Sequence, residues 1–282
     1  MFQAPAYLSP SSIGTFRDCP MKFKFQKIDR LSEPPTWATH LGTFVHEVLE
    51  HFYQLDPDDR TPESVRAMAT QRWTESDWES QVNQLIKPEG TIVDFKKAAF
   101  ECMTNLWKVE DPRTTELVGM EHEVEADIDG VRVKGFIDRF TFDDDGQVII
   151  SDYKTGKVPN PKFKSEDDKF FQLITYALMM QEADQETTSK VQLLYLKFGQ
   201  VHEVAVTPVK LNIARGVIVE TKEMVDASCA SESFACNVTK LCDWCDYKEW
   251  CPAHGGELAR AREEGTARVN VRRREAGLPV AP

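Results

Sequence analysis

Two carboxylates and a lysine lie close together in the sequence between Gly135 and Lys154. Asp138 belongs to the segment Gly135-Phe-Ile-Asp-Arg, and Asp152-Tyr-Lys154 follows after a short turn. Asp152 and Lys154 are two residues apart, so on a β-strand both side chains point to the same face. Two acidic oxygens can bind a divalent cation such as Mg²⁺, and a nearby lysine can position or activate a water. These residue types are the minimum set for metal-dependent hydrolysis of a phosphodiester.

The segments around these acids are predicted to form a β-hairpin. Residues 131–142 and 147–154 have the pattern of strands, and the Asp-Asp-Asp-Gly sequence at 143–146 is typical of a turn. The hairpin would bring Asp138 close to Asp152. An Asp-x-Lys pair is also common on an ordinary solvated strand face. Here, however, the face that carries Asp152 begins apolar and ends charged, which favours a strand that leaves the core at a site.

The remaining elements predict an α/β protein. A strand over 117–128 precedes the hairpin through a tight turn at Asp129-Gly130, and a second hairpin spans 191–198 and 201–206. Five further segments are predicted to be helical: 8–30, 41–55, 61–108, 169–183 and 207–228. Because helices precede the sheet and alternate with strands after it, the order predicts an α/β core with a helical insertion at 61–112.

Two of these helices carry polar side chains beside their apolar residues. His46 flanks the apolar stripe of the helix 41–55, where it could face a cleft and bind a metal or a phosphate, although a surface or hydrogen-bonded histidine is the commoner case. Gln172 and Tyr176 lie one turn apart on the helix 169–183, so they can contact the same phosphate, water or lysine. Alone, neither observation identifies a site.

Cysteine usage is the second informative feature. The chain has seven cysteines and no expected secretory signal, which argues against a disulfide framework. Cys242-Asp-Trp-Cys245 and Cys251 are clustered as in a metal site, since closely spaced thiols amid polar residues are poor core material. Zinc and iron–sulfur clusters both take four ligands. Cys236 is the nearest candidate for the fourth ligand, and Cys19 is far away in the sequence.

The composition describes an ordinary soluble globular protein. The 282 residues, 41% hydrophobic and 28% charged, suffice for one large domain or two small ones. No run of about 18 apolar residues predicts a membrane span, so we expect a cytoplasmic protein without membrane association. The net charge of -12 argues against bulk electrostatic coating of nucleic acid, but not against an enzyme that acts on it. No G-x-x-x-x-G-K-[ST] run predicts a motor.

Taken together, four motifs resemble a known family. Gly42-x-x-x-His46-x-x-Leu-Glu, Gly135-x-Ile-Asp-Arg, Asp152-Tyr-Lys-Thr-Gly-Lys and Gln172-Leu-x-x-Tyr-Ala occur in the order found in the RecB-type branch of the PD-(D/E)XK nucleases. The cysteine triplet before Pro252 is similar to the iron–sulfur subgroup, which includes the CRISPR-adaptation exonucleases and the AddB nuclease domain. The resemblance covers roughly residues 8 to 255 and implies one nuclease domain over 1–255, with a cysteine segment at 229–255 and a charged tail at 256–282.

The resemblance implies a site, residue by residue. His46, Asp138 and Asp152 would bind Mg²⁺ or Mn²⁺. The Tyr153 carbonyl would assist them, and Lys154 would orient or deprotonate the attacking water. The residues implied to support the site and the DNA strand are Gln172 and Tyr176, and those implied to hold a [4Fe–4S] cluster are Cys19, Cys242, Cys245 and Cys251. That cluster, or Zn²⁺ as its alternative, would join the N- and C-terminal segments beside a restriction-endonuclease-like core, a mixed sheet flanked by helices.

Two functions of different classes follow from these observations. The first is a metal-dependent DNA exonuclease that acts on single-stranded DNA or DNA ends in recombination, repair or processing, alone, as a homo-oligomer, or with a helicase or recombination partner. The second is a non-catalytic module that binds DNA ends and keeps the fold. The acids and the lysine at 138, 152 and 154 favour the enzyme.

Overall fold

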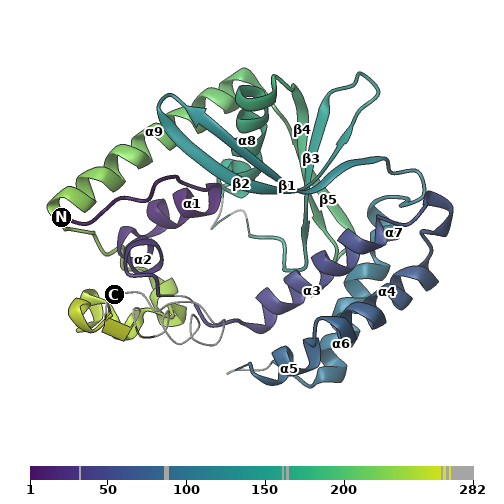
Figure 1. Ribbon diagram of the computed structural model, residues 1–282, viewed down its shortest axis with the longest axis horizontal. Helices are drawn as coiled ribbons and strands as arrows, with labels where there is room; N and C mark the ends of the chain where they lie inside the picture. Colours follow the sequence, from purple (N-terminus) through teal and green to yellow (C-terminus); the bar gives the residue numbers. More distant parts are fainter. Residues whose placement is uncertain are drawn as a thin grey trace. The chain divides into compact units, whose positions relative to one another are not determined.

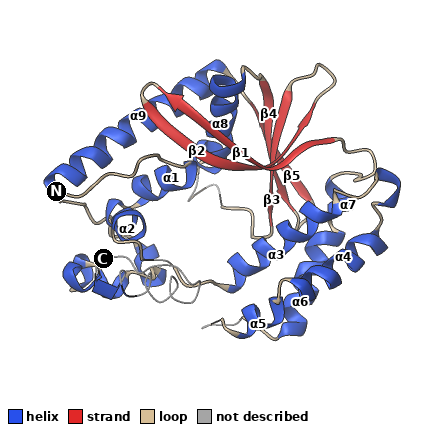
Figure 2. Cartoon of the chain, viewed as in Figure 1, coloured by secondary structure: helices blue, strands red, loops and turns tan. Residues whose placement is uncertain are grey.

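The computed structural model describes residues 1–31, 33–85, 89–160, 162, 165–261, 263–264 and 267, so most of the predicted tail at 256–282 lies outside the described residues. The described part contains a five-stranded sheet in the order β1-β2-β3-β4-β5 (Figure 2). Its strands are β1 (Leu117–Ile128), β2 (Val131–Phe142), β3 (Val148–Lys154), β4 (Thr188–Tyr195) and β5 (Gln200–Ala205).

The sheet is mixed, which confirms the predicted fold class at this level. β3 pairs with β2 antiparallel and with β4 parallel, and β4 pairs with β5 antiparallel. A parallel pair needs a long crossover. That crossover is α8 (Glu166–Asp184), which Ser165 caps by accepting a hydrogen bond from the Asp168 backbone N–H. An acidic first turn, Glu166 to Asp168, also suits the positive end of the helix dipole.

Helix α3 (Trp37–Phe52) packs with a group of helices that follow it in the sequence and precede β1 (Figure 1). Thr36, Thr61 and Thr91 each precede one of these helices. Each caps its helix by accepting a hydrogen bond from the backbone N–H three residues later. The other members are α4 (Pro62–Glu75), α5 (Trp78–Asn83), α6 (Ile92–Thr104) and α7 (Leu106–Val109). Their buried aromatic rings form one core, in which Phe44 of α3 contacts Trp73, Trp78 and Phe95.

The two faces of the sheet have different roles. Tyr153 and Leu194 share one face, and both belong to the apolar core formed with α3, α4 and α6. Because side chains alternate along a strand, Asp152 points to the other face. Helix α8 packs on that second face, where the Tyr176 ring lies against Gly135 of β2. The sheet therefore separates a helical core from the face that carries the conspicuous acids.

By internal contacts the chain forms two compact units. One comprises Pro35–Ala126 and Gly135–Ala214, and the other comprises Met1–Pro34, Asp127–Lys134 and Arg215–Pro282. Strands β1 and β2 and helix α9 (Pro208–Ser231) contribute to both. The division differs from the expected single domain over 1–255, which stays a prediction.

The second unit joins the two ends of the chain. Helices α1 (Pro10–Asp18) and α2 (Pro20–Phe23) are followed by a π-helical turn, Lys24–Ile28. The Met21 N–H donates to the Ala235 carbonyl, and the Tyr247 hydroxyl donates to the Leu31 carbonyl at 2.9 Å. The Tyr247 ring also stacks on Phe25. Cys242 lies in one of three short 3₁₀ turns, and Cys245 and Cys251 flank them. The turns span Lys240–Trp244, Lys248–Trp250 and Pro252–His254. In the described part of the chain, no helix combines the length and apolar character that a membrane crossing requires.

Candidate metal and catalytic site

Three potential metal ligands from three elements meet at one place. One donor atom each of His46 on α3, Asp138 on β2 and Asp152 on β3 lies within 4.8 Å of the others. His46 Nε2 is 2.8 Å from the Tyr153 carbonyl oxygen, and its Nδ1 is 3.6 Å from Asp138 Oδ2. Because a carbonyl only accepts, the proton of a neutral His46 lies on Nε2, and Nδ1 presents a lone pair toward the acids.

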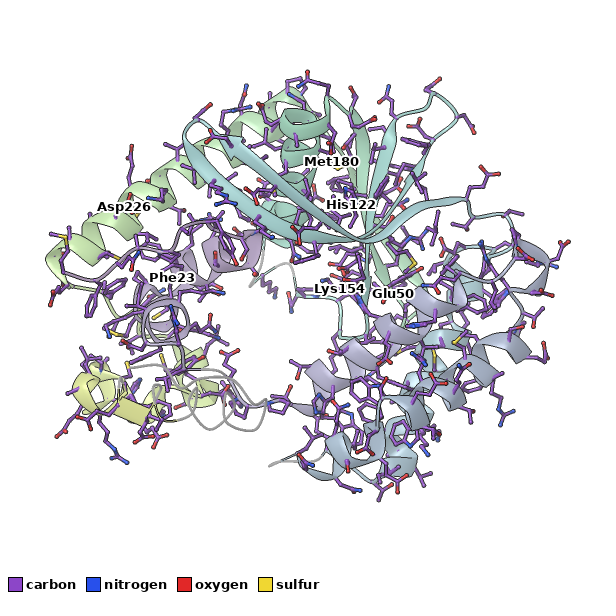
Figure 3. The ribbon with its side chains drawn as sticks, viewed as in Figure 1. Phe23, Glu50, His122, Lys154, Met180 and Asp226 are labelled. Atoms are coloured by element: carbon purple, nitrogen blue, oxygen red, sulfur yellow. The ribbon has the colours of Figure 1, made fainter. Side chains whose placement is uncertain are left out.

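Asp152 is the most enclosed of the three. It is 3% exposed, its Oδ2 forms an ion pair with Lys154, and its Oδ1 has no hydrogen-bond partner among the described residues. A buried carboxylate oxygen without a partner is costly, so its position indicates a cationic ligand. Lys154, which Figure 3 labels, is partly exposed at the end of β3 and can reach a substrate as well as Asp152.

The two aspartates behave as a close pair. Burial, followed by the charge of the nearby Asp152 and a hydrogen bond to it, raises the pKa of Asp138 to about 9. Two carboxylates at this separation cannot both ionise without a compensating charge. In the metal-free protein a proton on Asp138 supplies the compensating charge, and a divalent cation would replace that proton.

Gln172 and Tyr176 of α8 border the same acids. Gln172 Nε2 donates to the Tyr176 hydroxyl at 3.4 Å. Burial raises the pKa of Tyr176, and the charges of Asp138 and Asp152 raise it further. The structure therefore places Gln172 and Tyr176 near the two aspartates, and the two side chains contact each other as expected for residues one helical turn apart.

Two nearby groups were missed by the sequence reasoning. Glu121 of β1 lies within electrostatic range of His46 and Asp152, and burial raises its pKa. Its backbone has a left-handed φ of 47°, which interrupts the strand alternation, so no local pattern pointed to it. Tyr195 of β4 is also near Asp152, and it stands beside Lys154 in the strand register.

A buried polar network supports the strands behind the site. Arg139, which follows Asp138, is 2% exposed and donates to Glu110 at 2.5 and 2.9 Å. It also donates to the hydroxyl of Tyr153, the residue between Asp152 and Lys154. Tyr53, the residue that follows α3, donates to Glu110. Charge-assisted bidentate bonds of this kind fix orientation. The network thus ties α3, β2 and β3 together directly behind the acids.

The other unit contains a cavity surrounded by thiols. Its lining includes five of the seven cysteines: Cys19, Cys236, Cys242, Cys245 and Cys251. All are free of disulfides, and the sulfurs of Cys236 and Cys251 are 3.8 Å apart. Cys19, implied by the resemblance, and Cys236, suggested by spacing, therefore line the same cavity. The remaining Cys102 and Cys229 are buried elsewhere.

The mixed sheet carries two acids and a lysine on β2 and β3, and residues of these types can support the hydrolysis of a phosphodiester. The model of the PD-(D/E)XK nuclease superfamily matches residues 7–252, so this chain belongs to that superfamily. Membership supports nuclease activity.

Two further proteins are similar to this chain. The Gene 69 protein of Mycobacterium phage L5 is 27% identical over 209 residues, covering 60% of this chain and 69% of that protein. The crystal structure of a "Putative exonuclease" from Eubacterium rectale covers 85% of this chain and 86% of its own, with a TM-score of 0.53 and 13% identity. At that identity the second likeness shows the fold alone.

Proposed function

We propose that this chain is a metal-dependent DNA exonuclease of the RecB-type, iron–sulfur branch, acting on single-stranded DNA or DNA ends. The observation that carries the proposal is the convergence of His46, Asp138 and Asp152 within 4.8 Å, with Lys154 paired to Asp152. Carboxylate and imidazole donors beside a lysine are suited to phosphodiester hydrolysis.

The donor set fits Mg²⁺ or Mn²⁺. The unpartnered Oδ1 of Asp152 and the raised pKa of Asp138 both indicate a place for a cation. His46, Asp138 and Asp152 would hold the ion with the Tyr153 carbonyl. The ion supplies a Lewis acid and charge stabilisation at the phosphate.

The surrounding side chains supply the remaining chemistry. Lys154 would orient or deprotonate the water that attacks the phosphorus, and its charge would stabilise the phosphate as negative charge builds up. Gln172 and Tyr176, which hydrogen-bond each other at 3.4 Å, would hold Lys154 and the DNA strand in place. Arg139 and its partners would keep the two strands in register.

A cluster in the other unit completes the proposal. Cys19, Cys242, Cys245 and Cys251 would hold a [4Fe–4S] cluster, with Zn²⁺ as the alternative occupant. The shared cavity and the absence of disulfides at these cysteines support a thiolate-ligated group. Its role would be structural, because it would link residues from both ends of the chain.

The setting of the enzyme is part of the same proposal. Because the sequence has no P-loop motif, strand separation would come from a helicase or recombination partner, or the substrate would already be single-stranded. A homo-oligomer is compatible with this arrangement.

The test is cleavage of end-labelled single-stranded, linear double-stranded and closed circular DNA by anaerobically purified protein with Mg²⁺ or Mn²⁺. We expect loss of linear DNA but not of circles, and no loss with Asp152→Ala. Equal cleavage of circles would reject the exonuclease. Binding of DNA ends without cleavage, in a folded and metal-loaded protein, would favour the non-catalytic end-binding module.

A further inference from the structure

A line of polar side chains extends from the catalytic acids across the sheet. In the strand register Asp152 stands beside Leu193 of β4, and Leu193 stands beside His202 of β5, so all three side chains share one face. With strands about 4.8 Å apart, His202 is roughly 10 Å from Asp152 between backbones. Tyr195, two residues beyond Leu193, lies near Asp152 and packs its ring edge-to-face on His202, with the ring centroids 5.1 Å apart.

Lys169 of α8 contacts the far end of this line. Its Nζ lies 3.1 Å from His202 Nδ1. An ammonium group only donates, so Nδ1 accepts and the imidazole proton lies on Nε2. Burial and then the charge of Lys169 lower the pKa of His202, which keeps the ring neutral at pH 7.

Lys169 is a cation without a carboxylate partner within 4.0 Å among the residues that the structure describes. Besides His202, its described neighbour is the Phe170 ring, 4.8 Å from Nζ. The nearby acids are used elsewhere, since Asp168 accepts from Ser165 and Glu166 lies 4.0 Å from Lys210. Lys169 therefore keeps unused donors next to His202, on the face that carries Asp152.

We propose that Lys169 and His202 form a phosphate-binding subsite that holds the DNA strand beside the scissile phosphate, a proposal that rests on the proposed nuclease function. The ammonium supplies the donors and the charge for a phosphate oxygen, and His202 holds the ammonium in place by accepting at Nδ1. The Nε2–H of His202 points away from Lys169 and can donate to an adjacent part of the same DNA strand. A separation of roughly 10 Å is larger than one phosphate group, so the subsite holds a flanking phosphate and not the one that is cleaved. Tyr195 fixes the imidazole so that Nδ1 faces Lys169.

The chain offers a matched control on the opposite face of the sheet. Lys190 of β4 lies 3.1 Å from Glu203, which neighbours His202 along β5 and points the other way. Lys190 has the same charge as Lys169 and is also partly exposed, but its charge is neutralised by a carboxylate and it does not share a face with Asp152.

The experiment measures binding of a fluorescein-labelled single-stranded oligothymidylate over a salt series, by anisotropy, in an Asp152→Asn background that prevents cleavage. We expect Lys169→Ala to reduce the slope of log affinity against log salt by about 0.7 and to weaken binding about fivefold at 0.1 M salt. His202→Ala should weaken binding as well. Lys169→Arg keeps the charge and should bind within about twofold of the parent, as should Lys190→Ala.

The outcomes distinguish a failure of the subsite proposal from a failure of the nuclease proposal. If Lys169→Ala has the affinity and salt slope of Lys190→Ala, the subsite is wrong, whether or not the wild type cleaves DNA. If the wild type cleaves nothing but the slope still depends on Lys169, the subsite stands and the nuclease proposal falls. Thermal unfolding of each variant shows that a loss of affinity is not a loss of fold.

Discussion

Tyr176 leaves no room for a side chain at Gly135. A Cβ atom added to Gly135 would lie 2.7 Å from Cε1 of the Tyr176 ring. Gly135 lies on β2, three residues before Asp138, and Tyr176 lies on α8, so the contact fixes the distance between the helix and the acid-bearing strand. The glycine of the Gly135-x-Ile-Asp-Arg motif is therefore explained by packing against the tyrosine of the Gln172-x-x-x-Tyr motif.

Gly135→Ala should therefore destabilise the protein and reduce cleavage. Overpacking costs about 1–3 kcal/mol, and relief of the clash displaces Tyr176 from the acids. The matched control is Gly216→Ala on α9, where a Cβ would meet nothing within 4 Å, and which should stabilise by about 0.5–1 kcal/mol. Urea unfolding and oligonucleotide cleavage measure both effects. Equal changes in stability and in cleavage for the two variants would mean that Tyr176 does not constrain the residue at position 135.

Local sequence patterns predicted the hairpin of β1 and β2 well. The strands over 117–128 and 131–142 have the predicted bounds, because Asp129-Gly130 forms the tight turn and apolar residues alternate on both sides. The positions of Asp138 and Asp152 relative to each other depend on the next local hairpin, in which β2 pairs with β3.

In the hairpin of β4 and β5, the first strand was predicted three residues too late and the second strand one residue too late. β4 spans Thr188–Tyr195, not 191–198, because the polar residues at its start pair with β3 and the apolar residues at its end form a turn in which Gly199 has φ 59°. Such pairing depends on tertiary contacts, which no local pattern contains. The same reason explains why Glu121 and the contact of Lys169 with His202 were not foreseen.

Asp138→Asn should stabilise the metal-free protein while it abolishes cleavage. An unfolded aspartate ionises near pH 3.9, whereas folded Asp138 keeps its proton up to a pKa of about 9. Between these values the folded state binds more protons, so folding stability falls as pH rises. An amide has no charge to bury and should raise stability at pH 8 by about 0.5–2 kcal/mol.

Unfolding in EDTA at pH 5 and pH 8 measures this difference. The wild type should lose stability between the two values, and Asp138→Asn should lose less. Asp144→Asn in the exposed turn is the control and should follow the wild type. The same pH dependence in all three proteins would contradict a shared proton at the acid pair.

Arg139→Met should be strongly destabilising. It would leave Glu110 without the donors at 2.5 and 2.9 Å, and removing one partner of a buried ion pair costs about 3–5 kcal/mol. Arg113→Met removes an exposed pair with Asp111 at 3.0 Å and should leave stability almost unchanged, because water screens the pair. Urea unfolding compares the stability of the two variants. Similar losses of stability would mean that the buried network around Arg139 does not hold the strands together.

The cysteine cavity allows the ligand set to be assigned by substitution. Cys19→Ser and Cys245→Ser should each lose the metal and lower stability, because a thiolate site with a missing ligand binds weakly. Cys236→Ser should keep the metal, although its sulfur lies 3.8 Å from that of Cys251, and Cys229→Ser, buried outside the cavity, is the control.

Metal analysis and visible absorption of anaerobically purified protein measure these outcomes. A brown chromophore with iron would identify an iron–sulfur cluster, and colourless protein with zinc would identify the alternative. Loss of the metal in Cys236→Ser and its retention in Cys19→Ser would reverse the assignment. The site would then be closed within the C-terminal segment, without a ligand from residue 19, and the proposed link between the two ends of the chain would rest only on contacts such as that of Tyr247 with Leu31.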